Sequence, residues 1–263
     1  MIFSKNKLPD TWPAFARRVR GGQEKLLPRL DDYPDSVLVT GCQRSGGTML
    51  ARVITRSQGM VNYWFGKDDE LDAALVLSGW AKEPCRGRYC FQTTYLNECY
   101  PEYFEHPGHR IIWSLRNPHS VVYSMVYNWK NFALDELFLT CGYGEMDHAD
   151  RIRFQRFGLL GIPRLRRAAY AYNGKVGQLF ALKRGYPADR LAVLEYDQLV
   201  REKTRLLPDL YQFIGLPYQS QYADPISPRS LNKKDGLKAG EARVVDEICM
   251  PVYRAALDAL TLK

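Results

Sequence analysis

Short apolar runs and longer stretches with helical periodicity alternate along this chain. The apolar runs predict buried strands at 36–40, 89–93, 111–115 and 191–196, and a further strand with its loop at 59–66. Apolar positions three or four residues apart predict helices from residue 48 onward and over 12–20, 120–129, 204–213 and 241–260. Gly215 and Pro217 mark the end of the helix at 204–213. The pattern predicts an α/β fold.

The segment 36–56 is predicted to be a strand, a glycine-containing loop and a helix. Gly41–Thr48 has the outline of a P-loop, G-x-x-x-x-G-K-S/T, but Gly47 occupies the lysine position and Arg44 supplies a cation three positions earlier. Such a loop binds anions through free backbone N–H groups and the positive end of the helix dipole. We therefore expect a loop that binds phosphate but does not bind the γ-phosphate of a nucleoside triphosphate. The expected fold is three-layered and P-loop-NTPase-like, with a central parallel sheet flanked by helices. The alternative is a plain strand-turn-helix with small residues for packing.

A second strand-loop-helix is predicted over His109–Met125. Its strand ends at Arg116, where the corresponding strand of an ATPase commonly ends in a metal-binding Asp. An arginine in that place predicts a second anion site and no metal. Ser124 lies eight residues further on and can donate its hydroxyl to the same anion. The alternative is a surface arginine that caps a loop.

Length and composition narrow the class of protein. A chain of 263 residues with 46% hydrophobic content suits one α/β domain over 1–263, with 1–35 as a lead-in and 130–185 as a helical insertion. Six scattered cysteines without a C-x-x-C pair predict reduced thiols in a cytoplasmic protein. We expect no signal peptide and no membrane span.

The charge is strongly basic, with a net charge of +8. The sequence shows no nucleic-acid-binding pattern, so the excess of positive charge predicts a strongly anionic ligand. One basic cluster either forms the solvated face of a helix or lines the access path of an anionic ligand: Arg151, Arg153, Arg156, Arg164, Arg166 and Arg167. The acidic run at 67–72 either begins a helix, where it complements the dipole, or supplies a catalytic carboxylate.

Both strand-loop-helix segments resemble those of the sulfotransferases that use 3′-phosphoadenosine 5′-phosphosulfate (PAPS). In that family a P-loop-like segment binds the 5′-phosphosulfate, and a segment reading R-N-P-x5-S binds the 3′-phosphate. Arg44–Thr48 is similar to the first and Arg116–Ser124 to the second. Leu194–Leu199 resembles the family's Y-E-D-L segment and Gln212–Pro217 its F-L-G-L-P segment, in the same order along the chain. The resemblance covers residues 36–253.

The resemblance implies which residues bind PAPS. Those expected at the 5′-phosphosulfate are Arg44, Ser45, Gly46, Gly47 and Thr48, and those expected at the 3′-phosphate are Arg116 and Ser124. Met49 and Tyr196 are expected near adenine, although Tyr196 is alternatively a core strand residue. Arg44 and Met49 replace a lysine and a tryptophan of the phenol-sulfating branch. The chain therefore resembles the arginine-type branch, which includes protein-tyrosine and carbohydrate sulfotransferases.

The base that takes the acceptor's proton is indicated less directly. The phenol-sulfating branch has a histidine about 22 residues before the R-N-P arginine, but Thr94 stands there. The arginine-type branch tends to use a carboxylate roughly 20 to 25 residues after its loop arginine, a window that contains Asp68 and stops just short of Glu70. Either carboxylate is the expected base. The alternatives are His106, His109, His119 and His148.

The sequence thus predicts a metal-independent sulfotransferase that moves a sulfuryl group from PAPS to a hydroxyl or amine. The acceptor is expected to be a small or carbohydrate-like molecule, covered by the insertion at 130–185. The alternative is a nucleotide-binding P-loop-like protein, such as a degenerate kinase, without sulfuryl transfer. The missing lysine at Gly47 and the arginine at position 116 favour the first. The acceptor's identity and the oligomeric state stay open.

Overall fold

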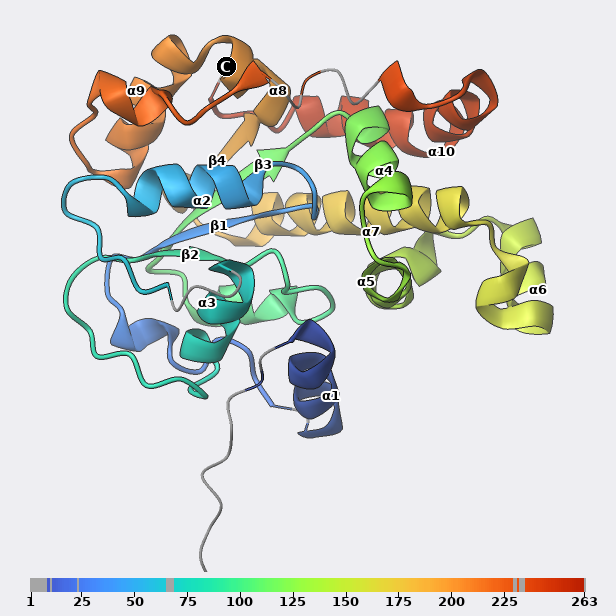
Figure 1. The fold of residues 1–263 in the computed structure, drawn as a ribbon, viewed down its shortest axis with the longest axis horizontal. Helices are drawn as coiled ribbons and strands as arrows, with labels where there is room; N and C mark the ends of the chain where they lie inside the picture. The colour runs from blue at the N-terminus through green and yellow to red at the C-terminus, as the bar shows by residue number, and fades with distance from the viewer. Residues whose placement is uncertain are drawn as a thin grey trace, which may run out of the picture.

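Four parallel strands form the centre of the computed structural model, in the order β2-β1-β3-β4 (Figure 1). They are β1 (Val37–Gly41), β2 (Cys90–Gln92), β3 (Arg110–Leu115) and β4 (Leu191–Glu195). The structure describes residues 9, 11–22, 24–64, 69–228, 231 and 235–262, with the backbone alone at 19–22. These strands confirm the predictions at 36–40, 89–93, 111–115 and 191–196 to within one residue at each end.

The sheet is buried on both faces, because successive side chains of a strand point to opposite sides. Val37 and Val39 pack on one face with α2 (Gly47–Thr55) and α9 (Lys203–Ile214). Leu38 and its neighbours pack on the other face, whose helices are α3 (Asp69–Leu77), α4 (Pro118–Tyr127), α7 (Arg164–Gly185) and α10 (Ala239–Leu257). Figure 1 shows α2 along one side of β1 and α7 along the other. The predicted three-layer arrangement, with a parallel sheet between helices, is confirmed.

The remaining α-helices lie at the edges of this sheet and of the helices that cover its faces. They are α1 (Trp12–Gly22), α5 (Asn131–Leu137), α6 (His148–Phe157) and α8 (Tyr196–Arg201). The region 130–185 is helical as expected, with a π-helical turn at 138–142 between α5 and the segments that lead to α7. The acidic run opens α3, whose first turn holds Asp69, Glu70 and Asp72. Negative charge at this helix end complements the dipole.

The predicted strand at 59–66 is wrong. Its described part, 59–64, is a loop with one isolated β-bridge, from Met60 to Arg88, which precedes β2. Tyr63 is buried against Tyr89 and Phe91, with ring centroids 6.0 and 4.9 Å apart. The apolar run therefore reflects burial in an aromatic cluster, which a loop supplies as well as a strand does.

All six cysteines are free thiols, as predicted. Cys42 lies in the loop after β1, where burial raises the pKa of its thiol to about 12. This thiol stays protonated at neutral pH and packs as a small apolar group. Within the described ranges, no helix combines the length and the apolar character needed to cross a bilayer.

Candidate functional site

The loop between β1 and α2 has a conformation that depends on two glycines. Gly41 has a φ of +134°, and a Cβ there would lie 2.4 Å from the carbonyl oxygen of Ser114 on β3. Gly46 has a φ of +92°, and its Cβ would lie 2.1 Å from the ring of Tyr196. A larger residue at either position would push the loop away from the sheet. The loop is further held by the Ser114 hydroxyl, which donates to the carbonyl oxygen of Ser45 at 2.8 Å.

Arg44 lies in the middle of this loop in an uncommon backbone conformation, with a φ of +71°. Non-glycine residues held at positive φ cluster at ligand-binding sites, where the surrounding structure imposes the strain. The Nε atom of Arg44 donates to the Ser124 hydroxyl on α4 at 2.9 Å. Burial lowers the pKa of the Arg44 guanidinium, and the like charge of Arg116 lowers it further. Two guanidinium groups close enough for one to lower the pKa of the other favour an anionic ligand.

Arg116, at the end of β3, is buried, with 3% of its surface exposed. Its Nε donates to the Asp197 carboxylate at 3.0 Å, and its Nη1 donates to the carbonyl oxygen of Arg44 at 3.3 Å. The guanidinium also lies 4.8 Å from the ring centre of Tyr196. Asp197 was not among the predicted site residues, although it directly follows Tyr196 in the segment that resembles Y-E-D-L. Its proximity shows that β3 and β4 place their last residues at one edge of the sheet.

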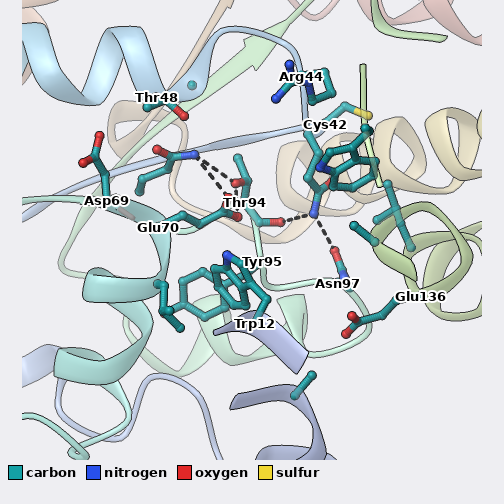
Figure 2. Close-up of a pocket in the computed structure, with 18 of the residues that line it drawn as sticks. Trp12, Cys42, Arg44, Thr48, Asp69, Glu70, Thr94, Tyr95, Asn97 and Glu136 are labelled. Atoms are coloured by element: carbon teal, nitrogen blue, oxygen red, sulfur yellow. Dashed lines mark hydrogen bonds between the residues drawn. The ribbon is translucent and has the colours of Figure 1, made fainter. Parts of the chain in front are cut away.

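One cavity of about 1320 Å³ brings the predicted residues together (Figure 2). Its lining includes Arg44, Gly46–Met49, Arg116, Ser124 and Tyr196 at one end, and Glu70 beside them. Of the predicted phosphosulfate residues, Ser45 is absent from the lining and is fully buried beneath the loop. The guanidinium groups of residues 44 and 116 therefore belong to one site and not to unrelated surfaces.

The other end of the cavity is lined by one element that the sequence did not place there and by one that it did. Trp12 and Phe15 come from α1, which was not expected at the site, whereas Phe132 comes from α5, within the expected insertion at 130–185, and Trp129 lies between α4 and α5. Figure 2 shows Trp12 next to Tyr95, and their ring centroids lie 5.7 Å apart. The segment 1–35 was expected to be only a lead-in. Its helix instead forms a wall of the cavity, and only the tryptophan and phenylalanine of an amphipathic segment signalled that it packs onto something.

Glu70 lies in the first turn of α3, where its carboxylate accepts two hydrogen bonds. Thr94 donates its hydroxyl to one oxygen, and Gln92 donates its side-chain amide to the other at 3.4 Å (Figure 2). Thr94 is the position where the phenol-sulfating branch would have its histidine, so the threonine orients a carboxylate there. The neighbouring Asp69 forms an ion pair with Arg52. Asp68, the other predicted base, lies outside the described residues.

The four histidines lie away from the cavity lining. His119 contacts Asp246 of α10 at 3.1 Å, and its backbone N–H is capped by Asn117 at the start of α4. His106 and His109 both contact Asp31, at 3.0 and 3.3 Å. His148 begins α6. The structure therefore gives the alternative histidine bases no place at the site.

The arginine cluster at 151–167 lies outside the cavity lining. Arg166 forms ion pairs with Asp147 and Asp150. Arg164 donates to the carbonyl oxygens of residues 125, 126 and 129 at 2.9, 2.8 and 2.6 Å, at the end of α4. A cation that caps the last carbonyls of a helix stabilises it. These arginines hold helices together.

No protein-family model matches the chain, and no curated protein matches it by sequence. Solved structures do match. A mouse sulfotransferase complexed with PAP, the adenosine 3′,5′-bisphosphate left after transfer, is 15% identical with a TM-score of 0.53, over 89% of this chain and 93% of that one. The sulfotransferase domain of the curacin biosynthetic pathway is 13% identical with a TM-score of 0.52, over 88% of this chain and all of that one.

A sulfotransferase from Mycobacterium avium is 12% identical, with a TM-score of 0.50, over 94% of this chain and 81% of that one. Identities this low say nothing about substrates, but the similarity extends over most of each chain. It agrees with the arrangement of a parallel sheet between helices. The chain has the fold of the PAPS-dependent sulfotransferases.

Proposed function

We propose that this protein is a sulfotransferase that moves a sulfuryl group from PAPS to a hydroxyl or amine of a small or carbohydrate-like acceptor. The observation that carries the proposal is the shared cavity. Two arginines, a glycine loop at a helix N-terminus and an oriented carboxylate line one space. The fold adds support, because similar structures include a sulfotransferase bound to PAP.

The residues at the basic end fit a nucleotide with phosphates at both ends of its ribose. The backbone N–H groups of Gly46–Thr48, at the N-terminus of α2, would receive the 5′-phosphosulfate. Arg116 and Ser124 would hold the 3′-phosphate, and Arg44, which belongs to the loop itself, contacts both of them. Tyr196 and Met49 line the same end and are available to adenine. Cations in these places do the work that a metal ion does in an ATPase, so the proposed reaction needs none.

PAPS would supply an activated sulfuryl group, and the protein's residues would do the rest. Negative charge grows on the oxygen that stays with the nucleotide, where Arg44 and the loop N–H groups are pre-aimed to stabilise it. Glu70 would take the acceptor's proton. The two donors on its carboxylate, from Thr94 and Gln92, fix its orientation. Residues of α5 line the acceptor end, which supports the expectation that the region 130–185 covers the acceptor.

Nucleotide preference tests the proposal. Thermal unfolding is measured with PAP and, separately, with ATP and Mg²⁺. We expect PAP to raise the melting temperature in proportion to the logarithm of its concentration. Stabilisation by ATP with Mg²⁺ alone would favour the degenerate-kinase alternative and overturn the proposal.

The role of Glu70 needs a second measurement, with labelled PAPS and a panel of acceptors. Glu70→Gln keeps the size of the side chain and removes the base. We expect its turnover to fall about 100-fold or more while its affinity for PAP stays unchanged. Equal turnover by the variant and the wild type would remove Glu70 from the mechanism.

A further inference from the structure

We propose that Lys175 is a positioning residue for the transfer, which holds the segment 94–97 in place and keeps the carboxylate of Glu70 aimed and ionised. This inference rests on the proposed function, in which Glu70 is the base. Lys175 is not part of the cavity lining, so it acts through its neighbours and not on a substrate directly.

Lys175 is a cation in the protein core. It lies in the middle of α7, and none of its surface is exposed. Its Nζ atom donates to two backbone carbonyl oxygens, that of Thr94 at 3.1 Å and that of Leu96 at 3.2 Å. Carbonyl dipoles offset only part of the cost of burying a full charge, so a neutral side chain of similar length would suit folding as well. The lysine therefore points to a role beyond folding.

A neutral residue one turn further along α7 binds the same segment. Gln178 donates its side-chain amide to the carbonyl oxygen of Asn97 at 2.7 Å. Residues three apart on a helix share a face, so Lys175 and Gln178 together hold the carbonyl groups of residues 94, 96 and 97. Gln178 does this without a charge. Hydrogen bonding alone therefore does not explain a lysine at position 175.

The segment 94–97 joins the base to the phosphate loop. The Thr94 hydroxyl donates to the carboxylate of Glu70 (Figure 2). The side-chain nitrogen of Gln43, in the loop after β1, donates to the carbonyl oxygen of Thr94 at 2.9 Å and to the side-chain oxygen of Asn97 at 3.0 Å. The segment thus sets where Glu70 lies relative to the loop that would hold the sulfuryl donor.

The charge of Lys175 also acts on Glu70 through space. Burial lowers the pKa of the Lys175 ammonium group, whereas the thiols of Cys141 and Cys42 and the carboxylates of Glu70 and Glu98 raise it. The attraction between two charges is mutual, so the ammonium group favours the ionised form of the Glu70 carboxylate. A general base has to be ionised before it can accept a proton.

The other groups around Glu70 do not replace this charge. The charged or titratable groups described near it are Arg44, Tyr95, Tyr103 and the ion pair of Asp69 with Arg52. The two tyrosines are neutral, because burial raises their pKa well above the usual 10. Arg44 attracts Glu70, but it also lines the cavity, where the phosphates of a nucleotide would neutralise it. A nucleotide would not reach the enclosed Lys175, so its effect on Glu70 would persist during the reaction.

Neutral variants at position 175 test the inference. Lys175→Met has no charge to bury and is expected to fold and to bind PAP like the wild type. We expect its maximal turnover to fall about 10–100-fold, because the base is less well aimed. The acid limb of its profile of kcat/KM against pH should move up by about one pH unit, because Glu70 loses an attractive charge. Lys175→Gln keeps a hydrogen-bond donor without the charge and should show the same shift of the limb.

Asn173→Ala is the matched control. Asn173 also lies in α7, is 7% exposed and donates to a backbone carbonyl oxygen, but its acceptor is Ile248 of α10, at 2.8 Å. The control should lower the melting temperature and leave turnover and the acid limb unchanged. Turnover is measured with labelled PAPS and with the hydroxyl acceptor that the wild type sulfates fastest among those that do not ionise between pH 5 and 8.

Hydrogen exchange over residues 94–97 gives a readout that needs no acceptor. We expect faster exchange there in Lys175→Met and no change in Asn173→Ala. An acid limb that stays in place in both variants at position 175, or exchange in Lys175→Met equal to that of the wild type, would overturn the inference. A wild type that PAP does not stabilise, or full turnover by Glu70→Gln, would count against the proposed function instead, so the two failures are distinguishable.

Discussion

Replacing Arg116 by Met is expected to weaken both folding and nucleotide binding, and the two effects can be separated. Arg116 and Asp197 are 3% and 4% exposed and form a pair at 3.0 Å. Removing one partner of a buried pair leaves an uncompensated charge and costs about 3–5 kcal/mol. In a domain of this size 1 kcal/mol shifts the melting temperature by about 2 °C. Arg116→Met should therefore melt about 6–10 °C below the wild type.

The double variant Arg116→Met/Asp197→Asn removes both charges while nearly keeping both volumes. We expect it to recover at least half of the lost stability, because no unpaired charge is left behind. Its affinity for PAP should stay low, since the cation for the 3′-phosphate is gone. Loss of one charge-assisted hydrogen bond, worth about 1.5–3 kcal/mol, corresponds to an increase of about 10–100-fold in Kd.

Calorimetric titration with PAP and thermal unfolding of the three proteins give both quantities. If the double variant regains stability and also binds PAP like the wild type, Arg116 acts only in folding and the proposed 3′-phosphate site is refuted. If the single variant is as stable as the wild type, the buried pair carries none of the energy assigned to it.

Three further changes test other parts of the structure. Gly46→Ala should raise the Kd for PAP at least tenfold, because it adds a left-handed penalty of about 1–2 kcal/mol and a clash with Tyr196 behind the loop. Gly59→Ala is the control for titration, with a φ of +89° and only an ordinary contact for its Cβ, at 3.6 Å from Leu216. Arg164→Met should lower the free energy of unfolding in urea by about 1–3 kcal/mol, because the carbonyls at the end of α4 lose their donor; Arg156→Met, on exposed α6, should change it little. Burial lowers the pKa of His109 below its usual 6.5, so the unfolded chain takes up the proton first as the pH falls from 7 to 5. Stability should therefore decline over that range, and the decline should be shallower in His109→Gln; an equal slope would remove His109 as its cause.

The strands of this fold could be predicted from local pattern because each is a short apolar run, and two of them end at a glycine or an arginine. The strand that ends at Gly41 and the strand that ends at Arg116 needed no knowledge of distant residues. The error at 59–66 has the opposite origin. Tyr63 contributes to the apolar run because its ring packs against Tyr89 and Phe91. A local sequence pattern does not distinguish such a buried loop from a strand.

The parts of the site that sequence reasoning missed are those made by distant pairs. The sequence around Arg116 does not indicate that Asp197 neutralises its charge. The sequence around Glu70 likewise does not indicate that Thr94 orients its carboxylate. The placement of Trp12 against Tyr95 likewise joins segments far apart in the chain. Such contacts are decided by tertiary packing, which a single sequence does not display.

The contact between Gly46 and Tyr196 has a consequence for how the protein is made. The two residues are 150 positions apart, and the tyrosine belongs to the first turn after the edge strand β4. A nascent chain that has emerged as far as β3 already contains the phosphate loop and its contact with Ser114, but it lacks the Tyr196 ring behind Gly46. Nucleotide therefore cannot assist the early stages of synthesis, since ligands stabilise only a state that binds them. Until the last quarter of the chain arrives, the partly made protein depends on burial in its own core for stability.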